Sequence, residues 1–401
     1  MLRLVADANI PAAQDAFAAF GAVRLLPGRE ITRAELATAD VLLVRSVTRV
    51  DAALLEGTPV RFVGTATAGT DHVDLDALRR LGVAFASAPG SNAASVVDYV
   101  LAALLALAAG RGDGLAGRTL GIVGVGQVGR RLARRAQALG LTVVASDPPL
   151  AAAGSDVGVP LLGLADVLAQ ADIVTLHTPL TTASESDHPT HGLLGADALA
   201  AMAPGAWLVN AARGPIVDGG ALAHALDRRR LAAAVLDVWP GEPAPDADLV
   251  RRVAIGTPHI AGYAFDGKVA GTRALEQALR RWRPGPTEPW DSGPTLAPPA
   301  PLVVHAPPAP SDPGDPAQQA AWLHALARQA YDVGADDARF RAALASTEDR
   351  GAQDRAAAFA GLRKAYPVRR EWSEYAVQGV VPPSLRRAVR GGLGMALAAS
   401  S

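Results

Sequence analysis

The chain has 401 residues, of which 50% are hydrophobic and 19% are charged, and its formal net charge is −1. This length and composition predict two or three domains, each with a sizeable buried core. A net charge near zero gives no electrostatic reason to expect binding to nucleic acid or to an anionic membrane surface. The sequence holds no cysteine, which excludes disulfides, thiolate nucleophiles and cysteine-ligated metals.

The first hundred residues alternate short apolar runs with helical stretches. Strands are predicted at 2–7, 39–46 and 60–67, with a helix over 11–21, and this alternation favours a parallel sheet with crossover helices. A long helix is predicted over 92–109. Its apolar part is shorter than the roughly 20 residues that span a bilayer, so we expect a buried helix and no membrane contact. The N-terminus lacks a signal-peptide pattern, so we expect a cytoplasmic protein.

A second alternating region begins near residue 118. Its continuous apolar runs are typical of strands covered on both faces. Strands are predicted at 118–124, 141–147, 171–179, 206–212 and 232–239, and helices at 130–139 and 221–229. The segment 286–316 is rich in proline and is predicted to be a linker with at most one short strand, LVVH, at 302–305. A smaller C-terminal domain is predicted over 317–401.

A glycine-rich motif indicates a dinucleotide site. Gly124-Val-Gly126-Gln127-Val128-Gly129 follows a predicted strand, opens a predicted helix and is followed by Asp147 about 20 residues later. The first glycine permits the tight turn, the second admits the pyrophosphate and the third allows the helix to pack on the strand. Asp147 is suited to accept hydrogen bonds from the ribose hydroxyls, and no Arg or Lys follows it. The motif therefore predicts NAD in preference to NADP.

Three polar residues follow the later strands of this region: Arg213, Glu242 and His259. Ligands in open α/β sheets bind beyond the carboxyl ends of the strands, so the three side chains are expected near one site. Their chemistry suits the oxidation of an alcohol. A histidine can accept the hydroxyl proton, a carboxylate beside it favours and orients the imidazolium, and an arginine can bind a substrate carboxylate and polarise the developing carbonyl.

Each member of this set also has an ordinary structural explanation. His259 alone is more often a capping or core histidine, Arg213 could occupy a surface turn, and Glu242 lies in a Pro-Gly-Glu-Pro sequence that is usually solvated. Their combination at matching strand ends favours the catalytic interpretation. In the segment 181–191, Asp187, His188 and His191 raise the question of a metal site. A solvated polar insertion is the preferred interpretation, and no metal is predicted.

Five motifs carry a resemblance to a known family: GIVGVGQVGR, HTPL, NAARGPIVD, LDVWPGEP and TPHIAGY. The chain resembles the D-isomer specific 2-hydroxyacid dehydrogenases. This resemblance implies an α/β fold with two Rossmann-like domains, parallel sheets and an active site in the cleft between them. Arg213, Glu242 and His259 match the family's catalytic set. The implied division is a substrate domain of 1–95 with 262–285, an NAD-binding domain of 96–261, the linker 286–316 and the C-terminal domain.

A narrower resemblance, to family members that oxidise a small phosphorylated hydroxyacid, rests on VRSVT, VGTATAGTDHVD, YDVGADDARFR and YPVRREWSEYAV. Those enzymes carry a C-terminal α+β dimerisation domain, which implies a homodimer. The implied NAD contacts are Gly124, Gly126, Gln127, Val128, Gly129, Asp147, Thr178, Ala211, Ala212, Arg213, Asp237 and Gly262. The candidate substrate contacts are Arg45, Ser46, Thr67 and Tyr263.

Two of these substrate positions also have support from the residues themselves. Thr67 opens a loop of small residues that is suited to offering backbone N–H groups to a carboxylate or phosphate. Arg45 is the nearest candidate to neutralise a phosphate. For Ser46 and Thr67, ordinary turn capping is the alternative, and Lys268 has no role that the sequence reveals.

Three other functions stay open at this point. The first is a different dehydrogenase of the same class, acting on phosphoglycerate or glyoxylate, although the C-terminal motifs argue against it. The second is a non-catalytic NAD sensor or co-repressor, which the complete Arg, Glu and His set disfavours. The third makes the C-terminal region a regulatory module that binds an effector through basic segments such as 363–370, although a charge run of this kind is usually a solvated face.

Overall fold

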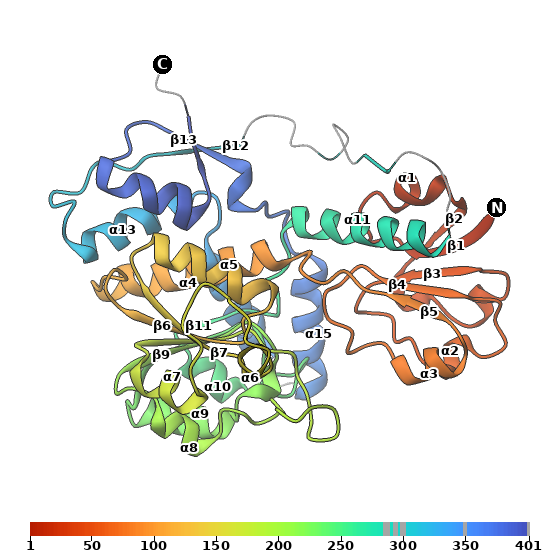
Figure 1. Cartoon of the computed structure of the whole chain (residues 1–401), viewed down its shortest axis with the longest axis horizontal. Helices are drawn as coiled ribbons and strands as arrows, with labels where there is room; N and C mark the ends of the chain where they lie inside the picture. Colours follow the sequence, from red (N-terminus) through yellow and green to blue (C-terminus); the bar gives the residue numbers. More distant parts are fainter. Residues whose placement is uncertain (284–288, 292–295, 297–301, 348–350, 399–401) are drawn as a thin grey trace. The chain divides into compact units, whose positions relative to one another are not determined.

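The structure, a computed structural model, describes residues 1–283, 289–291, 296, 302–347 and 351–398 (Figure 1). It divides into two compact units. The first unit consists of Met1–Ala94 with Tyr263–Ala300, and the second of Ser95–Gly262 with Pro301–Ser401. Part of the predicted linker at 286–316 lies outside the described residues. The domain boundaries expected from the sequence stay a prediction.

The first unit is built on a five-stranded parallel sheet with the order β2-β1-β3-β4-β5. Its strands are β1 (Leu2–Asp7), β2 (Gly21–Leu26), β3 (Val41–Val44), β4 (Phe62–Thr65) and β5 (Ala84–Ala86). The helices of this unit are α1 (Ala13–Ala18), α2 (Ala52–Leu55), α3 (Leu75–Arg80) and α11 (Phe265–Trp282).

Both faces of this sheet are covered. Phe17 of α1 and Leu275 of α11 share a core with the strands on one face, and Leu55 of α2 and Leu78 of α3 share a core on the other. Because both faces are buried, β3 and β4 are continuous apolar runs, which is why the sequence predicted them. Because all five strands are parallel, the loops that follow them lie at the same edge of the sheet.

The second unit contains a six-stranded parallel sheet with the order β11-β10-β9-β8-β6-β7. Its strands are β6 (Thr119–Val123), β7 (Thr142–Ser146), β8 (Ile173–Leu176), β9 (Ala206–Asn210), β10 (Leu231–Leu236) and β11 (Ile255–Gly256). The chain runs outward from β6 to β7 and then crosses back to β8 on the other side of β6. Such a switch point, at the carboxyl ends of the strands, is where α/β sheets bind their ligands.

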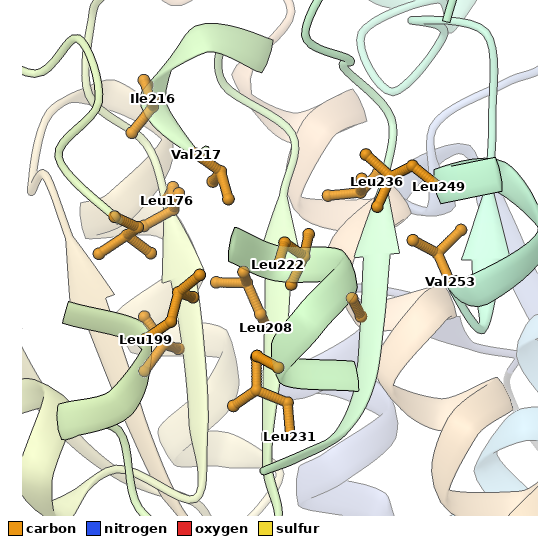
Figure 2. Close-up of a cluster of buried hydrophobic side chains, with 14 of the residues drawn as sticks. Leu176, Leu199, Leu208, Ile216, Val217, Leu222, Leu231, Leu236, Leu249 and Val253 are labelled. Carbon is orange, nitrogen blue, oxygen red and sulfur yellow. The ribbon is translucent and has the colours of Figure 1, made fainter. Parts of the chain in front are cut away.

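Helices lie on both faces of this sheet (Figure 1). On one face are α4 (Ala93–Arg111) and α5 (Gln127–Ala138), and α6 (Pro148–Ala152) follows β7. On the other face are α7 (Leu164–Gln170), α8 (Ala196–Ala201), α9 (Gly219–Asp227) and α10 (Ala247–Arg252). Figure 2 shows the core on that face, where Leu208 and Leu236 of the strands lie close to Leu199, Leu222 and Leu249 of the helices.

Among the described residues, α4 is the helix long and apolar enough to cross a membrane, with a mean hydropathy of 1.9. Its most apolar window is 78% buried inside the protein. The expectation of a buried core helix in this region is therefore confirmed.

The C-terminal segment forms a small parallel sheet with the order β12-β13-β14 and three helices. These are β12 (Leu302–His305), β13 (Tyr375–Gln378), β14 (Ala396–Leu397), α13 (Pro316–Ala327), α14 (Val333–Ala345) and α15 (Ala352–Lys364). The predicted strand LVVH is confirmed as β12. Among the described residues, short 3-10 turns lie at Gly28–Glu30, Ala34–Leu36, Gly214–Ile216, Trp372–Glu374 and Pro383–Leu385, and a π-helix lies at Ala388–Leu393.

This C-terminal segment packs on the six-stranded sheet. Phe340 of α14 and Phe359 of α15 belong to the same buried cluster as the strands β8 to β10, and the Phe340 ring lies 5.5 Å from the ring of Trp239. On the other side, Arg135 of α5 donates to the carbonyls of Gly392 and Leu393 at 2.6 Å each and pairs with Asp98. The C-terminal segment therefore shares its core with the second unit.

Candidate active site

The glycine-rich loop has the local geometry that a dinucleotide requires. Gly124 has a φ of +92°, a conformation that favours glycine. A Cβ on Gly129 would lie 2.2 Å from the carbonyl oxygen of Gly124, so only glycine lets α5 pack against the end of β6. At Gly126, by contrast, an added Cβ would meet open space. The backbone is thus exposed where the pyrophosphate is expected, at the N-terminus of α5.

Asp147 follows β7 and caps α6. One carboxylate oxygen accepts a hydrogen bond from the N–H of Val125 at 2.8 Å, and the other accepts from the N–H of Leu150 at 3.2 Å. The carboxylate thereby supports the glycine-rich loop, and each oxygen keeps a second lone pair for a ribose hydroxyl. Among the described residues, the buried hydroxyl of Thr178, next to this loop, has no hydrogen-bond partner. Buried polar atoms normally have a hydrogen-bond partner, and a bound dinucleotide would supply one for this hydroxyl.

His259 and Glu242 form a hydrogen-bonded pair beyond the ends of β11 and β10. His259 Nδ1 lies 2.8 Å from Glu242 Oε2, while Glu242 Oε1 accepts the N–H of Trp239 at 2.7 Å. A carboxylate only accepts hydrogen bonds, so Nδ1 carries the hydrogen and Nε2 presents its lone pair. Within the described chain, Nε2 makes no hydrogen bond, and the side chain is 33% exposed. In this pair, His259 is an accessible base, and the Glu242 carboxylate orients its ring.

The backbone of His259 has a φ of +57°, in the left-handed region that non-glycine residues rarely adopt. Such a conformation costs about 1–3 kcal/mol and persists when its surroundings hold it in place. Here the N–H of His259 donates to the carbonyl of Asp237 at 2.7 Å, and the carbonyl of Thr257 accepts from the indole of Trp239 at 2.8 Å. The strain therefore falls on the proposed catalytic histidine and is balanced by specific contacts.

Asp237, which the resemblance suggested as an NAD contact, also holds the loop at 257–262 that contains His259, which we call the histidine loop. Its buried carboxylate accepts hydrogen bonds from the hydroxyl of Thr257 and from the N–H groups of Ile260 and Ala261, at 2.7, 2.7 and 2.9 Å. Burial raises the pKa of the Asp237 carboxyl, and the neighbouring His259 and these donors lower it. The Thr257 hydroxyl uses its hydrogen in the bond to Asp237. It therefore accepts the hydrogen bond that joins it to the hydroxyl of Tyr99 at 2.7 Å. A buried chain of hydrogen bonds thus joins α4 to the histidine loop.

Arg213 follows β9, the strand next to β10. The side chain of Asn210 donates to the carbonyl of Arg213 at 2.9 Å, and one guanidinium nitrogen of Arg213 donates to the carbonyl of Ala212 at 2.8 Å. A Cβ on Gly214 would lie 2.0 Å from the carbonyl oxygen of Trp239, so the loops after β9 and β10 touch here. Arg213, Glu242 and His259 therefore follow three neighbouring strands at one edge of the second unit. Ala211 precedes them at this edge, and Gly262 ends the histidine loop.

In the first unit, the proposed substrate residues lie at the carboxyl edge of the five-stranded sheet or just beyond the histidine loop. Arg45 is half-buried and Ser46 is exposed after β3, and within the described chain neither side chain makes a hydrogen bond. Thr67, after β4, is engaged internally: its hydroxyl donates to the carbonyl of Gly69 at 2.8 Å. Lys268, which had no role from the sequence, lies 4.9 Å from the ring of Tyr263.

The loop that contains Thr67 presents backbone donors. Among the described residues, the N–H groups of Thr67, Ala68, Gly69 and Thr70 donate no backbone or side-chain hydrogen bond. Consecutive N–H groups of this kind are suited to an anion. They lie at the same edge of the first unit as Arg45, so this edge combines a fixed cation with backbone donors.

The polar insertion at 181–191 closes on itself. The hydroxyl of Thr190 donates to the carbonyl of Pro179 at 2.6 Å and accepts the N–H of Thr181 at 2.9 Å, while the Glu185 carboxylate accepts the N–H of Thr182 at 2.8 Å. The part of the chain that the structure describes contains no group of three metal-ligating side chains. The interpretation of 181–191 as a solvated insertion stays a prediction.

A parallel sheet with a dinucleotide loop at its switch point, beside a histidine and carboxylate pair, defines an NAD-binding dehydrogenase of the Rossmann type. Comparison with known proteins agrees. Residues 105–261 match the NAD binding domain of the D-isomer specific 2-hydroxyacid dehydrogenases, and residues 312–389 match a domain of unknown function, DUF3410. A crystal structure of a Thermus thermophilus protein is similar, with a TM-score of 0.61 and 31% identity, covering 72% of this chain and all of that one.

Relatives that align over nearly the whole chain narrow the assignment. The erythronate-4-phosphate dehydrogenase of Salinibacter ruber is 52% identical over 402 residues, covering 99% of both chains. The enzyme of the same name from Azotobacter vinelandii is 49% identical, covering 97% of this chain and 98% of its own. The chain belongs to the D-isomer specific 2-hydroxyacid dehydrogenase family and, within it, to the family of erythronate-4-phosphate dehydrogenases.

Proposed function

We propose that this protein oxidises 4-phospho-D-erythronate to 3-hydroxy-2-oxo-4-phosphobutanoate with NAD, a step in the biosynthesis of pyridoxal 5′-phosphate (vitamin B6). The observation that carries the redox chemistry is the hydrogen bond between His259 and Glu242 at the edge of the nucleotide-binding sheet. The choice of substrate rests on the near full-length similarity to enzymes with that name.

When bound, NAD would supply the acceptor for the hydride that leaves C2 of the substrate. His259 Nε2 accepts the proton of the C2 hydroxyl, so the C2–H and O–H bonds break as the carbonyl forms. Glu242 keeps Nδ1 protonated and stabilises the imidazolium that results. Arg213 is proposed to bind the substrate carboxylate and to stabilise charge on the developing carbonyl oxygen.

The residues at the glycine-rich loop fit this cofactor. The exposed Gly126 backbone and the N-terminus of α5 would hold the pyrophosphate, and Asp147 would accept from the ribose hydroxyls. A 2′-phosphate would meet the Asp147 carboxylate, and the next two residues are Pro148 and Pro149, which offer no positive charge. This favours NAD over NADP. The other proposed NAD contacts are Gln127, Val128, Thr178, Ala211, Ala212, Asp237 and Gly262.

The substrate is a dianionic phosphate ester that also carries a carboxylate, so it needs local positive charge in a protein of net charge −1. The proposed contacts in the first unit are Arg45, Ser46, Thr67 and Tyr263. Support comes from the guanidinium of Arg45 and from the backbone donors at 67–70. The Thr67 hydroxyl already donates to the carbonyl of Gly69. Thr67 is therefore expected to bind the substrate through its backbone N–H.

The test compares the purified protein with NAD and three acids: 4-phosphoerythronate, 3-phosphoglycerate and D-lactate. We expect the highest kcat/KM for NADH formation with 4-phosphoerythronate. A preference for either of the other acids would assign the protein to another dehydrogenase of the class. NAD binding with no turnover of any acid would instead indicate a sensor.

A homodimer in the cytoplasm is also proposed. In the C-terminal segment, Val368 and Val380 are 78% and 84% accessible, and burial of these side chains between two copies would stabilise a dimer. Light scattering on the intact chain should give twice the mass of one chain, and replacement of both valines by aspartate should lower it toward that of the monomer. A monomeric intact chain would contradict the proposal.

A further inference from the structure

The C-terminal segment contacts the loop of His259 at both ends. Before the histidine, the Asp337 carboxylate on α14 accepts a hydrogen bond from the N–H of Gly256 at 2.7 Å. After it, the guanidinium of Arg369 donates to the carbonyl of Ala261. The residues from Thr257 to Ile260, which include the proposed base, therefore lie between two anchors that belong to the region matching a domain of unknown function.

Arg369 is held in a fixed position. Only 6% of its surface is exposed, and its guanidinium lies 4.2 Å from the ring centre of Tyr331 and 5.9 Å from that of Tyr366. The hydroxyl of Tyr366 donates in turn to Asp336 at 2.8 Å. A planar guanidinium stacked on aromatic rings keeps its donor direction better than a flexible ammonium would.

The peptide that Arg369 contacts is constrained on both sides. The N–H of Ala261 donates to the buried carboxylate of Asp237, and its carbonyl accepts from Arg369. Two residues earlier, His259 has its left-handed backbone conformation, which requires surrounding contacts to persist. Asp237 holds the N–H groups of the loop, and Arg369 supplies the contact that Asp237 cannot make, because a carboxylate only accepts.

We propose that Arg369 is a positioning residue for the His259 loop, so that the C-terminal segment helps to set the geometry of the catalytic base. The inference rests on the proposed function, because it assigns the rate effect of Arg369 to His259. It gives the C-terminal segment a role within one chain, distinct from the proposed role in dimerisation. Asp337 acts in the same way from the opposite end of the loop.

The first test is a kinetic double-mutant cycle. Arg369→Met keeps the bulk of the side chain and removes the donor. We expect kcat to fall by about 10- to 100-fold, because small displacements of a catalytic group have effects of this size, with little change in KM for NAD. In the His259→Ala background the same change should have almost no further effect on residual turnover. Arg369→Lys should recover part of the rate, and Arg387→Met, an exposed arginine of the same segment, should change neither quantity.

The second test does not depend on activity. Amide exchange of the free protein should become faster at Ile260 and Ala261 in Arg369→Met and should stay unchanged in Arg387→Met. Equal rate losses in both His259 backgrounds, or unchanged exchange at these amides, would overturn the proposal. If Arg369→Met does not fold, Asp337→Ala is judged by the same two criteria. A wild-type protein that oxidises none of the three acids would remove the proposed function, while the exchange measurement would still decide the positioning role.

Discussion

At the carboxyl edges of the two sheets, the proposed catalytic base and the proposed substrate-binding residues after β3 differ in how far they are already hydrogen-bonded. At the six-stranded sheet, His259 has its Glu242 partner, and the buried Asp237 accepts three hydrogen bonds from the same loop. At the five-stranded sheet, Arg45 and Ser46 make no side-chain hydrogen bond within the described chain.

This contrast follows from what each edge is proposed to do. A base that accepts a proton must be oriented before the substrate arrives, since ordering it during the reaction would raise the barrier. Groups that bind a phosphate or carboxylate are better left with free donors, because a ligand then supplies the missing partners. We therefore expect changes to the His259–Glu242 pair to affect kcat and changes to Arg45 and Ser46 to affect the KM for the substrate.

The largest effect is expected for His259→Ala. Removal of the general base should lower kcat by about 10³-fold, while the affinity for NAD, measured by fluorescence titration, should stay nearly the same. His224→Ala, an exposed histidine on α9, is the matched control and should have normal activity. A His259→Ala protein with more than a tenth of the wild-type rate would remove this residue from the mechanism.

Glu242→Gln should have the next largest effect. The amide preserves the shape and can still accept the N–H of Trp239, but it loses the charge that stabilises the imidazolium. We expect kcat to fall by about 10²-fold with little change in the KM for substrate. Glu185→Gln, on the exposed insertion, serves as the control. A change confined to KM would show that Glu242 binds substrate and does not orient the base.

Asp147→Asn tests the nucleotide site with a smaller expected change. The amide oxygen can still accept from one backbone donor, but the negative charge is lost. The KM for NAD should rise by about 10-fold, and the preference for NAD over NADP should weaken, since a 2′-phosphate is no longer repelled. Asp246→Asn, which alters the cap of α10, should leave both values unchanged. Unaltered cofactor preference would place the ribose elsewhere.

A separate effect concerns stability at acid pH and not catalysis. Burial lowers the pKa of His177 to about 3, and its Nε2 lies 3.0 Å from the hydroxyl of Thr175. Between pH 6.5 and about 3 the unfolded chain therefore binds a proton that the folded chain excludes, so stability is lost as the pH falls through this interval. The loss is at most about 1.4 kcal/mol per pH unit.

Denaturant unfolding at several pH values would measure this dependence. His177→Asn should flatten it between pH 6.5 and about 3, while His305→Asn, which changes an exposed histidine, should not. An unchanged slope in His177→Asn would show that other groups cause the acid sensitivity.

The sequence predicted those parts of the fold that depend on local pattern. The buried strands β1, β6 and β9 are apolar runs. In the dinucleotide loop, Gly124 is favoured by its positive φ and Gly129 by its close approach to the carbonyl of Gly124. Strand β2 was missed because it is a half-exposed edge strand with no continuous apolar run. Strand β11, which the sequence implied before His259 without giving its bounds, has only two residues.

The supports of the histidine loop were harder to predict. Arg369 and Ala261 are 108 residues apart, and Asp337 and Gly256 are 81 apart, so no local pattern joins them. Thr257 and Trp239 lie close in sequence to predicted site residues. Their residue types alone, however, do not indicate which groups their side chains hydrogen-bond. The sequence identified the residues proposed to carry the chemistry, whereas the residues that hold them became visible only in the fold.

The central claim is that the base is oriented before ligands bind. Crystal structures of the protein alone and with NAD and 4-phosphoerythronate would test it most directly. We predict that His259, Glu242 and Asp237 keep the same hydrogen bonds in both, and that Arg45 and Ser46 gain partners from the substrate. A free protein in which His259 and Glu242 are apart, and meet only in the ligand complex, would contradict the account.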